Sequence, residues 1–304
     1  MAVSFAALTA EEIALAAADK PILASTPDPD QLDAGWETGT ISGTLAGATD
    51  DAANRPAERA WDGLPGLQTL PDATFAANTL VMESSVGIEF DFVAYLNHNF
   101  FTIGATTVTL QVADDTGFTT NVRSLSTLNP AGGSTDRRLA DLSLFHTGGT
   151  PLRYSGVQFM RLQISSGGSL LPKIGQVILG RRRQLKHEPN RPWDPTDLYS
   201  SLDRFESRGG SITDTPRFLG RREIHANLNP DASPHVQDLV DWYAGIQYGR
   251  LPLVWFDRPT GAPNDFYFMK MIEPNFQYPY IAPFVREFNL NAVEQGPNFF
   301  TQDP

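Results

Sequence analysis

The 304-residue chain contains no cysteine, and this absence removes several classes of chemistry at once. Without thiols the protein has no disulfide, no thiolate nucleophile and no thiolate metal site. The sequence therefore carries no mark of an oxidising compartment, and we expect the protein to fold in a reducing cytoplasm. Hydrophobic residues make up 41% and aromatic residues 11% of the sequence. This is enough for a sizeable core, and the length suggests two domains.

Basic residues are also scarce, because 23 lysines and arginines face 35 aspartates and glutamates, giving a net charge of −12. A protein that neutralises nucleic-acid phosphates needs a basic face, so we expect no nucleic-acid partner. Several arginines do gather in "GRRRQLKH" at 180–187. Short basic runs are typical of a solvated linker or a protein-contact surface, and we expect one of these here.

The N-terminus lacks the features of a signal peptide or a membrane span, because no basic residues lead it and Glu11 and Glu12 interrupt its apolar residues. We therefore expect no membrane insertion. Thr9 and Glu12 have the spacing of a capping box, which predicts the start of a helix. Pro21 would end it, leaving a helical arm over 1–20. Such an arm docks on its own domain or reaches a neighbouring subunit.

Helical periodicity is missing between 80 and 180, where apolar and polar residues alternate instead. In "VGIEFDFVAYL" the alternation places Glu89 and Asp91 on the polar face. In "VQFMRLQIS" it holds only after a slip at Met160 and Arg161, which indicates a bulge. The core residues expected on these strands are Ile88, Phe90, Phe92, Val108, Leu110, Val112, Phe159, Leu162, Ile164, Ile174, Val177 and Leu179. The pattern predicts an antiparallel β-sandwich.

Five segments of this region come in a characteristic order. They are "AERAWDGLPG" (57–66), "VGIEFDFVAYLNHNF" (86–100), "TTVTLQVADDTGF" (106–118), "GVQFMRLQIS" (156–165) and "KIGQVILG" (173–180). The order resembles the galactose-binding-like, discoidin-type jelly rolls, and the variant with Asn-His-Asn is similar to domains of bacteriophage tail and tail-tip proteins. The resemblance covers roughly half the chain. It implies a jelly roll over 21–185.

His98, between two asparagines, is the first candidate for a functional residue. A neutral imidazole flanked by amides can bond backbone carbonyls in a loop at the rim of a sandwich and hold its turn. Catalysis would need a partner group, and the sequence has no G-x-S-x-G elbow, no H-E-x-x-H helix and no glycine-rich phosphate loop. We therefore expect a structural role for His98, and no catalytic residue or cofactor site in the chain.

Two groups of aspartates are further candidates. Asp114 and Asp115 precede Thr-Gly, the composition of a turn in which aspartates bond nearby amides. In "STPDPDQLDAG", Asp28, Asp30 and Asp33 offer oxygens to a calcium ion. Some jelly rolls of the resembling superfamily hold a structural calcium in an early loop. The stretch lacks an EF-hand pattern, so we expect an exposed turn rich in proline and aspartate, without a required metal.

Trp36 and Trp61 are candidates for stacking on a sugar ring, as the lectin-like members of the superfamily imply. A tryptophan in a β-sandwich buries a large area whatever the protein does. We therefore expect both residues to pack in the core or at its rim.

A domain boundary is predicted near "RRRQLKHEPNRPWDP", whose three prolines forbid a continuous helix or central strand. Beyond it, "SITDTPRFLGRREIHANLN" indicates two strands around a turn at Gly220. "SPHVQDLVDWYAGIQYG" indicates a helix with Ser233 as N-cap, Pro234 at its first position and Trp242 beside its apolar face. That face consists of Val236, Leu239, Val240, Tyr243 and Ile246. Further strands are expected at 251–257, 265–273 and 284–294.

This α+β unit, 186–304, resembles the ring-forming domain of siphophage distal tail proteins, although those usually carry the ring domain first. The resemblance implies a structural subunit of a tail tip or baseplate, located in the virion, that forms a threefold or sixfold homo-oligomeric ring and contacts the tube, hub and fibre proteins. "LPLVWF", "DFYFMKM", "NFQYPYIAPF" and "GPNFF" hold more aromatics than such a unit would bury by itself. This excess predicts an interface with another copy.

Two alternatives stay open beside the structural subunit. A glycan-binding module, or a tail protein that contacts a host-surface glycan, would need an exposed aromatic platform with convergent polar groups. A glycosidase or esterase with an appended binding domain would need a carboxylate or Ser/His site that the sequence does not offer. We expect a mainly β protein that is not an enzyme.

Overall fold

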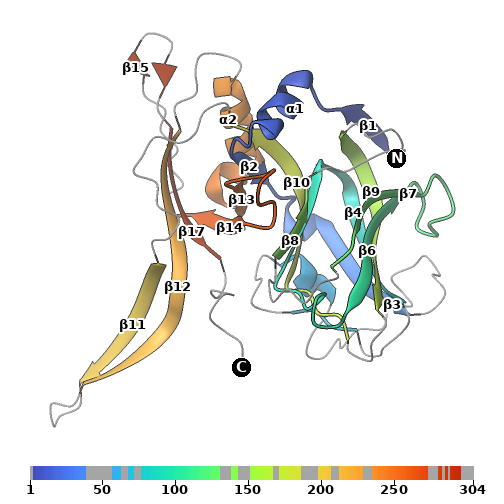
Figure 1. Ribbon diagram of the computed structural model, residues 1–304, viewed down its shortest axis with the longest axis horizontal. Coiled ribbons are helices and arrows are strands. Elements are labelled where there is room, and N and C mark those ends of the chain that lie inside the picture. The colour runs from blue at the N-terminus through green and yellow to red at the C-terminus, as the bar shows by residue number, and fades with distance from the viewer. Residues whose placement is uncertain are drawn as a thin grey trace.

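In the computed structural model the described residues are 3–38, 57–62, 68–71, 77–130, 138–142, 151–166, 171–185, 198–206, 212–228, 235–272, 280–282, 285–286 and 288–295. They form a mainly β protein, as expected, with two α-helices, α1 (Ala10–Ala17) and α2 (His235–Gly245). Figure 1 shows these helices lying near one another at one end of the molecule.

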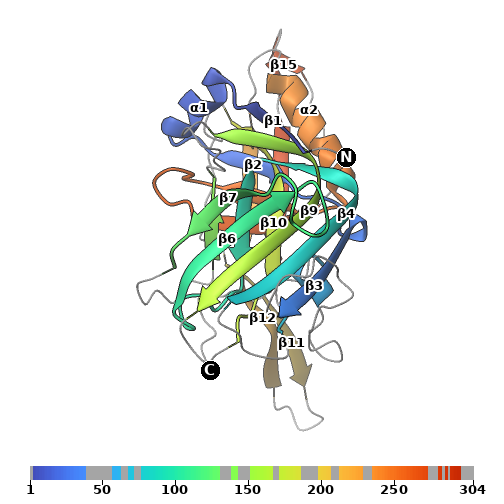
Figure 2. The same cartoon turned by 90° about the vertical axis from the view of Figure 1, so that its right-hand side faces the viewer.

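A six-stranded antiparallel sheet forms one layer of the protein, in the order β3-β4-β9-β6-β7 with β1 paired to β9 (Figure 2). Its strands are β1 (Ser4–Ala7), β3 (Leu32–Thr38), β4 (Ala77–Phe90), β6 (Ala105–Ala113), β7 (Arg123–Leu128) and β9 (Leu152–Ser166). The opposite layer contains β5 (Phe92–Leu96), β8 (Arg138–Asp141) and β10 (Gln176–Gln184). The predicted antiparallel sandwich is therefore confirmed.

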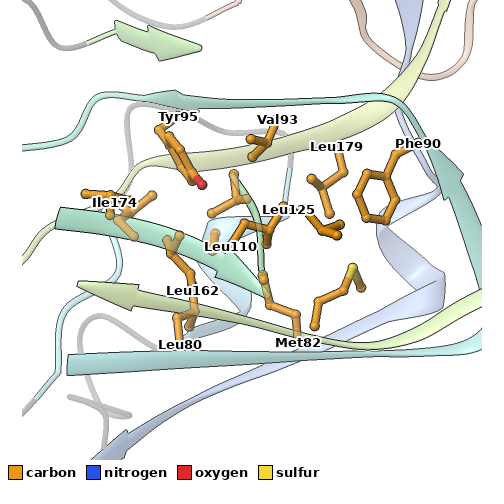
Figure 3. Close-up of a cluster of buried hydrophobic side chains, with 14 of the residues drawn as sticks. Leu80, Met82, Phe90, Val93, Tyr95, Leu110, Leu125, Leu162, Ile174 and Leu179 are labelled. Atoms are coloured by element: carbon orange, nitrogen blue, oxygen red, sulfur yellow. The ribbon is translucent and has the colours of Figure 1, made fainter. Parts of the chain in front are cut away.

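The sandwich core follows the alternation of the strands. Figure 3 shows Val93, Tyr95 and Leu179 from one layer facing Leu110 and Leu162 from the other. The expected core residues found in this cluster are Ile88, Phe90, Val108, Leu110, Val112, Leu162, Ile164, Ile174, Val177 and Leu179. Each such side chain stabilises the fold by about 1.5–3 kcal/mol through its removal from water.

The segment predicted as one strand around Asp91 is two strands in two different sheets. Strand β4 ends at Phe90 and pairs with β9, whereas β5 begins at Phe92 and pairs with β10 and β8. The chain therefore crosses between the layers at Asp91, which is buried rather than on a polar face. Because of this crossing, Phe92 packs in a different cluster from Phe90.

The predicted bulge in β9 is wrong. Strand β9 keeps an unbroken register with β4 from Phe159 to Ser165, so its alternation is regular there. Met160 lies in the sandwich core, and Phe159 packs on the outer face against a small cluster that includes Phe118. Arg161 shares that outer face, with its guanidinium carbon 4.4 Å from the centroid of the Phe118 ring.

The second sheet continues beyond the sandwich as nine strands, in the order β11-β12-β17-β14-β13-β2-β10-β5-β8. Its other strands are β2 (Ile22–Ser25), β11 (Leu198–Glu206), β12 (Ile212–Leu228), β13 (Leu253–Phe256), β14 (Phe266–Met271) and β17 (Phe288–Glu294). Strands β15 (Tyr280–Ala282) and β16 (Val285–Arg286) form a separate pair.

The division of the chain into domains at 21–185 and 186–304 stays a prediction. Strand β2 pairs with β10 on one side and with β13 on the other, so the hydrogen-bonded sheet spans both segments.

The nine-stranded sheet curls so that its end strand β8 approaches the start of β14 and the residues just before it. The Ala140 N–H donates to Asn264 Oδ1 at 2.9 Å, and Arg138 Nη1 donates to the carbonyl of Phe266 at 3.0 Å. A second apolar cluster lies on this face and joins strands from both segments. It consists of Ile22, Ala24, Phe92, Ala94, Leu96, Ala140, Leu142, Ile178, Val254, Phe256, Phe266 and Phe268.

A third apolar cluster packs helix α2 onto the sheet. Leu239 and Ile246 are buried as predicted, and Val236 and Tyr243 pack against the cluster. Trp242 is buried in it as well, so it covers the protein's own sheet. Ser233 and Pro234 lie outside the described residues. The strands expected at 251–257, 265–273 and 284–294 correspond to β13, β14 and β16–β17.

The aromatic residues of β13 and β14 are buried within the chain. Trp255 and Tyr267 lie in the α2 cluster, whereas Phe256, Phe266 and Phe268 lie in the cluster of the curled sheet. Two of the four aromatic segments therefore leave no surplus for another copy. The other two, 275–284 and 296–300, lie mostly or wholly outside the described residues.

The N-terminal segment docks on its own chain, which was one of the two expected outcomes. Glu12 Oε2 accepts from the Thr9 N–H at 2.9 Å and Thr9 Oγ1 accepts from the Glu12 N–H at 3.2 Å, which confirms the capping box. Strand β1 pairs with β9, and Glu12 forms an ion pair with Arg153 at 2.7 Å. Burial raises the pKa of Glu12, but the bonds from Arg153 and Thr9 outweigh it and hold that pKa below the ordinary value.

Candidate functional site: a projecting hairpin and a buried ion-pair network

His98 is part of the wall of the sandwich. Its side chain is buried, Nδ1 accepts from the Phe100 N–H at 3.2 Å, and its ring stacks on Phe100 with centroids 4.3 Å apart. The flanking asparagines hold the loop: Asn99 Oδ1 accepts from the Lys173 N–H at 2.7 Å, and Gln68 Nε2 donates to the backbone carbonyl and to Oδ1 of Asn97 at 2.8 and 3.1 Å. These contacts fix the turn, although Nδ1 bonds a backbone N–H where a carbonyl was expected.

Asp114 and Asp115 form the predicted turn. Asp115 accepts from the N–H groups of Thr119 and Thr120, and Asp114 accepts from Asn121 Nδ2 at 2.7 Å. These bonds lower the pKa of both carboxyls, led by the Thr119 side chain for Asp115 and by Asn121 for Asp114. Asp114 also accepts from the Val3 N–H at 2.9 Å, which ties the N-terminal segment to this turn.

The carboxylate of Asp28 is turned toward protein donors. Asp28 Oδ1 accepts from the Asp30 N–H at 3.2 Å and caps a short 3₁₀ turn, while Oδ2 accepts from Gln247 Nε2 at 2.7 Å. Asp33 lies beyond this turn in β3. Within the described ranges, no three His, Asp or Glu side chains are grouped closely enough to hold a metal ion. That the loop requires no calcium stays a prediction.

The two candidate tryptophans have different outcomes. Trp61 is buried in the sandwich core, which confirms the packing role. The side chain of Trp36 lies outside what the structure describes.

A buried carboxylate that sequence reasoning placed on the surface organises the corner between the two layers. The side chain of Asp91 is 0% exposed, and it accepts from Arg153 Nε at 3.0 Å and from the Arg182 N–H at 2.9 Å. Glu12 and Glu89 complete the arrangement around Arg153, at 2.7 and 3.7 Å. Burial raises the pKa of Asp91, while Arg182 and Arg153 pull it in the opposite direction.

The arginine run at 180–187 therefore has a different role from a linker. Arg181, Arg182 and Arg183 belong to β10, a strand in the interior of the nine-stranded sheet. Arg182 is buried and donates from Nη1 to the carbonyl of Leu142 at 2.8 Å. Arg181 pairs with Glu89 at 3.4 Å. A basic run predicts a surface position because charged residues rarely occupy a central strand.

A second architectural feature is the β11–β12 hairpin. Strand β12 is one continuous strand through Gly220, and it pairs with β17 only over Glu223–Leu228. Among the described strands, residues 212–222 pair only with β11, so the hairpin extends past the rest of the described sheet on the order of 30 Å. Figure 1 shows β11 and β12 reaching away from the sandwich. The predicted turn at Gly220 is wrong.

Among the described strands, β11 of the hairpin is the last strand at one end of the nine-stranded sheet. Strand β11 ends the sheet on one side, whereas β8 at the other end is joined through Ala140 and Arg138 to residues 264–266. A two-stranded hairpin is marginally stable in water, and an edge strand presents unpaired N–H and C=O groups to another chain. The geometry therefore fits a surface that a partner covers.

Comparisons with known proteins give distant structural similarities. No family model and no curated protein matches the chain. Among solved structures, chitosan-binding module 1 of a Paenibacillus sp. IK-5 chitosanase/glucanase is 15% identical, with 49% of this chain and 94% of that chain covered and a TM-score of 0.35. The family 32 carbohydrate-binding module of Clostridium perfringens NanJ, in complex with galactose, is 10% identical, with 53% and 99% covered and a TM-score of 0.35. No helix in the described parts of the chain has the length and apolar character to cross a membrane.

Proposed function

We propose that the protein is a non-catalytic structural subunit that assembles with copies of itself through the β11–β12 hairpin. The observation that carries the proposal is the pairing of residues 212–222, which bond to β11 and to no other described strand. An element of this shape gains stability when another surface covers it. Its identity as a tail-tip subunit, located in the virion with tube, hub and fibre partners, rests on the sequence resemblance alone.

Charge favours a second copy as the partner. The hairpin segment 198–222 contains five arginines and three acidic residues, a net charge of +2. Since the whole chain has a net charge of −12, the remainder carries −14. The basic hairpin of one copy is therefore complementary to the acidic body of the next. A contact between two different patches can repeat from copy to copy, and it closes as a ring when the rotation between neighbours divides a full turn.

The test is the mass of the protein in solution with and without the hairpin. In the shortened variant an Asn-Gly turn replaces 202–217 and joins Ser201 to Phe218, which are paired in the register. We expect the full chain to sediment as a closed oligomer, with an interface on the order of 2,000 Å² or more per contact. The shortened variant should be a monomer with an unchanged melting temperature.

Tyr248→Ala is the matched control for this experiment, since it removes the exposed aromatic ring of another surface and should leave the oligomer intact. A full chain that is monomeric at every concentration contradicts the proposal. So does a shortened variant that keeps the oligomeric mass.

Glycan binding is the second candidate, and an exposed aromatic residue favours it. Tyr248 is 65% exposed, and its ring meets Tyr243 edge to face at 5.4 Å. Its backbone has a φ of 58°, next to Gln247 at 49°, and non-glycine residues in this region cost about 1 kcal/mol or more each. Gln247 is held by its bond to Asp28. An exposed ring of this kind offers a flat apolar face on which a sugar ring can stack.

Calorimetric titration with galactose and chitotriose tests the second candidate. If Tyr248 forms the platform, one of these sugars binds the full chain, and Tyr248→Ala weakens that binding about three- to tenfold through loss of the stacking contact. Phe5→Ala, which removes a partly exposed ring on β1, is the control and should bind as the full chain does. Equal binding by the Tyr248→Ala variant would contradict the assignment.

A further inference from the structure

An open groove of about 420 Å³ lies between the sandwich and helix α2. Its walls come from four parts of the chain: β2 with the turn after it, the C-terminal part of β4, β10 and α2. The polar and charged residues that line it are Ser25, Thr26, Gln31, Glu89, Arg181, Arg183 and Asp241. Its volume is in the range of small-molecule sites in proteins.

Two arginines supply the positive side of the groove. Arg181 and Arg183 are two residues apart on β10, so both project to one side of the strand. Arg181 is partly satisfied by Glu89 Oε2 at 3.4 Å, and its Nε is buried without a hydrogen-bond partner among the described residues. Because this Nε is buried, Arg181 would contact a ligand in the groove through its terminal Nη groups.

Arg183 has no ion pair or hydrogen bond from its guanidinium within the described part of the chain. Burial lowers the pKa of Arg183, and the neighbouring charge of Arg181 lowers it further, while Asp238 and Asp241 act in the opposite direction. Asp241 is engaged with Gln237 Nε2 at 2.7 Å. A half-buried arginine in this position gains from an added anion, which replaces the water that it has lost.

The other groups in the groove accept hydrogen bonds from hydroxyls. The carboxylates of Glu89 and Asp241 are acceptors only, and Ser25, Thr26 and Gln31 are both donors and acceptors. A simple anion would use the arginines and be repelled by the carboxylates. A ligand with an oxyanion at one end and several hydroxyls at the other satisfies both sets.

We propose that this groove binds an anionic polyhydroxylated molecule, a sugar acid or a sugar phosphate, with Arg183 and Arg181 holding the oxyanion and Glu89 and Asp241 accepting from the hydroxyls. The guanidinium groups match carboxylate and phosphate oxygens with parallel N–H donors. Carboxylate and phosphate are the two sources of the same recognition chemistry, and titration with each distinguishes them.

The experiment is calorimetric titration of the full chain with glucuronate and with glucose 6-phosphate, beside glucose, inorganic phosphate and acetate as partial ligands. We expect at least one of the two anionic sugars to bind, and each partial ligand to bind at least about tenfold more weakly. Arg183→Gln should reduce the affinity for the anionic sugar by about tenfold or more. Arg258→Gln, which removes the same charge from an exposed turn outside the groove, should have no effect.

A second variant tests the groove by its shape. Gly245 lines it, and a Cβ built there would lie 3.5 Å from Ser25 Oγ with no backbone strain. Gly245→Leu should therefore fill the groove and abolish binding while the protein keeps its circular dichroism spectrum and melting temperature. The proposal is overturned if neither anionic sugar binds, if inorganic phosphate binds as tightly as the sugar phosphate, or if both variants bind as the unmodified protein does.

Discussion

Asp91→Ala should lower the free energy of unfolding by about 3–5 kcal/mol, because it leaves two arginines without their buried counter-charge. The carboxylate is fully buried between Arg153 and the Arg182 backbone, and Arg182 itself is nearly inaccessible. When one partner is removed, the remaining buried charges are unpaired, and their full desolvation penalty then lowers the free energy of unfolding. Urea denaturation followed by circular dichroism measures the loss.

Glu89→Gln is the control for Asp91, since it changes the same network at a site where water reaches the side chain. Glu89 is 38% exposed and meets Arg153 and Arg181 at 3.7 and 3.4 Å. Exposed pairs of this kind contribute about 0–1 kcal/mol. If the alanine variant does not fold, Asp91→Asn is measured in its place, because asparagine has nearly the same shape as aspartate without its charge. A loss below about 1 kcal/mol for both Asp91 variants would show that the network does not stabilise the corner.

Gly180→Ala should break the junction between the sandwich and the C-terminal strands. A Cβ at Gly180 would lie 1.8 Å from the carbonyl oxygen of Ser25, a backbone atom of the paired strand β2. No rotamer change can relieve a clash with backbone, so β2 and β10 must separate locally. Overpacking costs about 1–3 kcal/mol in ordinary cores, and we expect a loss at or above the top of that range.

Hydrogen exchange gives this prediction a local readout, because amides of β2 and β10 should lose protection together in Gly180→Ala. Gly245→Ala is the matched control: its Cβ would make an ordinary contact with Ser25 Oγ, and the added helix propensity stabilises α2 by up to about 1 kcal/mol. Unchanged stability and protection in Gly180→Ala would mean that the two strands tolerate the separation.

The sandwich was predictable because strands such as β6 bury one face only, and their sequences therefore alternate. The alternation of Val108, Leu110 and Val112 fixes which side of β6 meets the core, and the structure confirms it. The capping box at Thr9 and Glu12 was predictable for a similar reason, since both partners lie within one helical turn. Patterns that are local in sequence report local structure.

The corner at Asp91 could not be found in this way. Alternation runs without a break through Phe90, Asp91 and Phe92, although the chain changes sheets between them. The partners that make burial of the carboxylate tolerable, Arg153 and Arg182, come from strands far along the chain. No local signal joins the three residues, and an aspartate without them is correctly assigned to the surface.

The turn predicted at Gly220 is wrong because a glycine within a strand pattern can indicate either a turn or a bulge. Residues 219 and 220 of β12 face the single residue 200 of β11, since Phe218 pairs with Ser201 and Arg221 with Tyr199. The glycine therefore sits at an irregularity within a continuous strand, where it marks a bulge and not a chain reversal.

The double pairing of β2 also sets an order of events during synthesis. Strand β2 occupies Ile22–Ser25, and its partners β10 and β13 emerge from the ribosome much later, β13 last at Leu253–Phe256. Until then β2 has at least one open edge, which is a template for wrong pairing with a neighbouring nascent chain. The chain can complete its central sheet only when translation is nearly finished, so yield in a cell should depend on protection of this early segment while the rest is made.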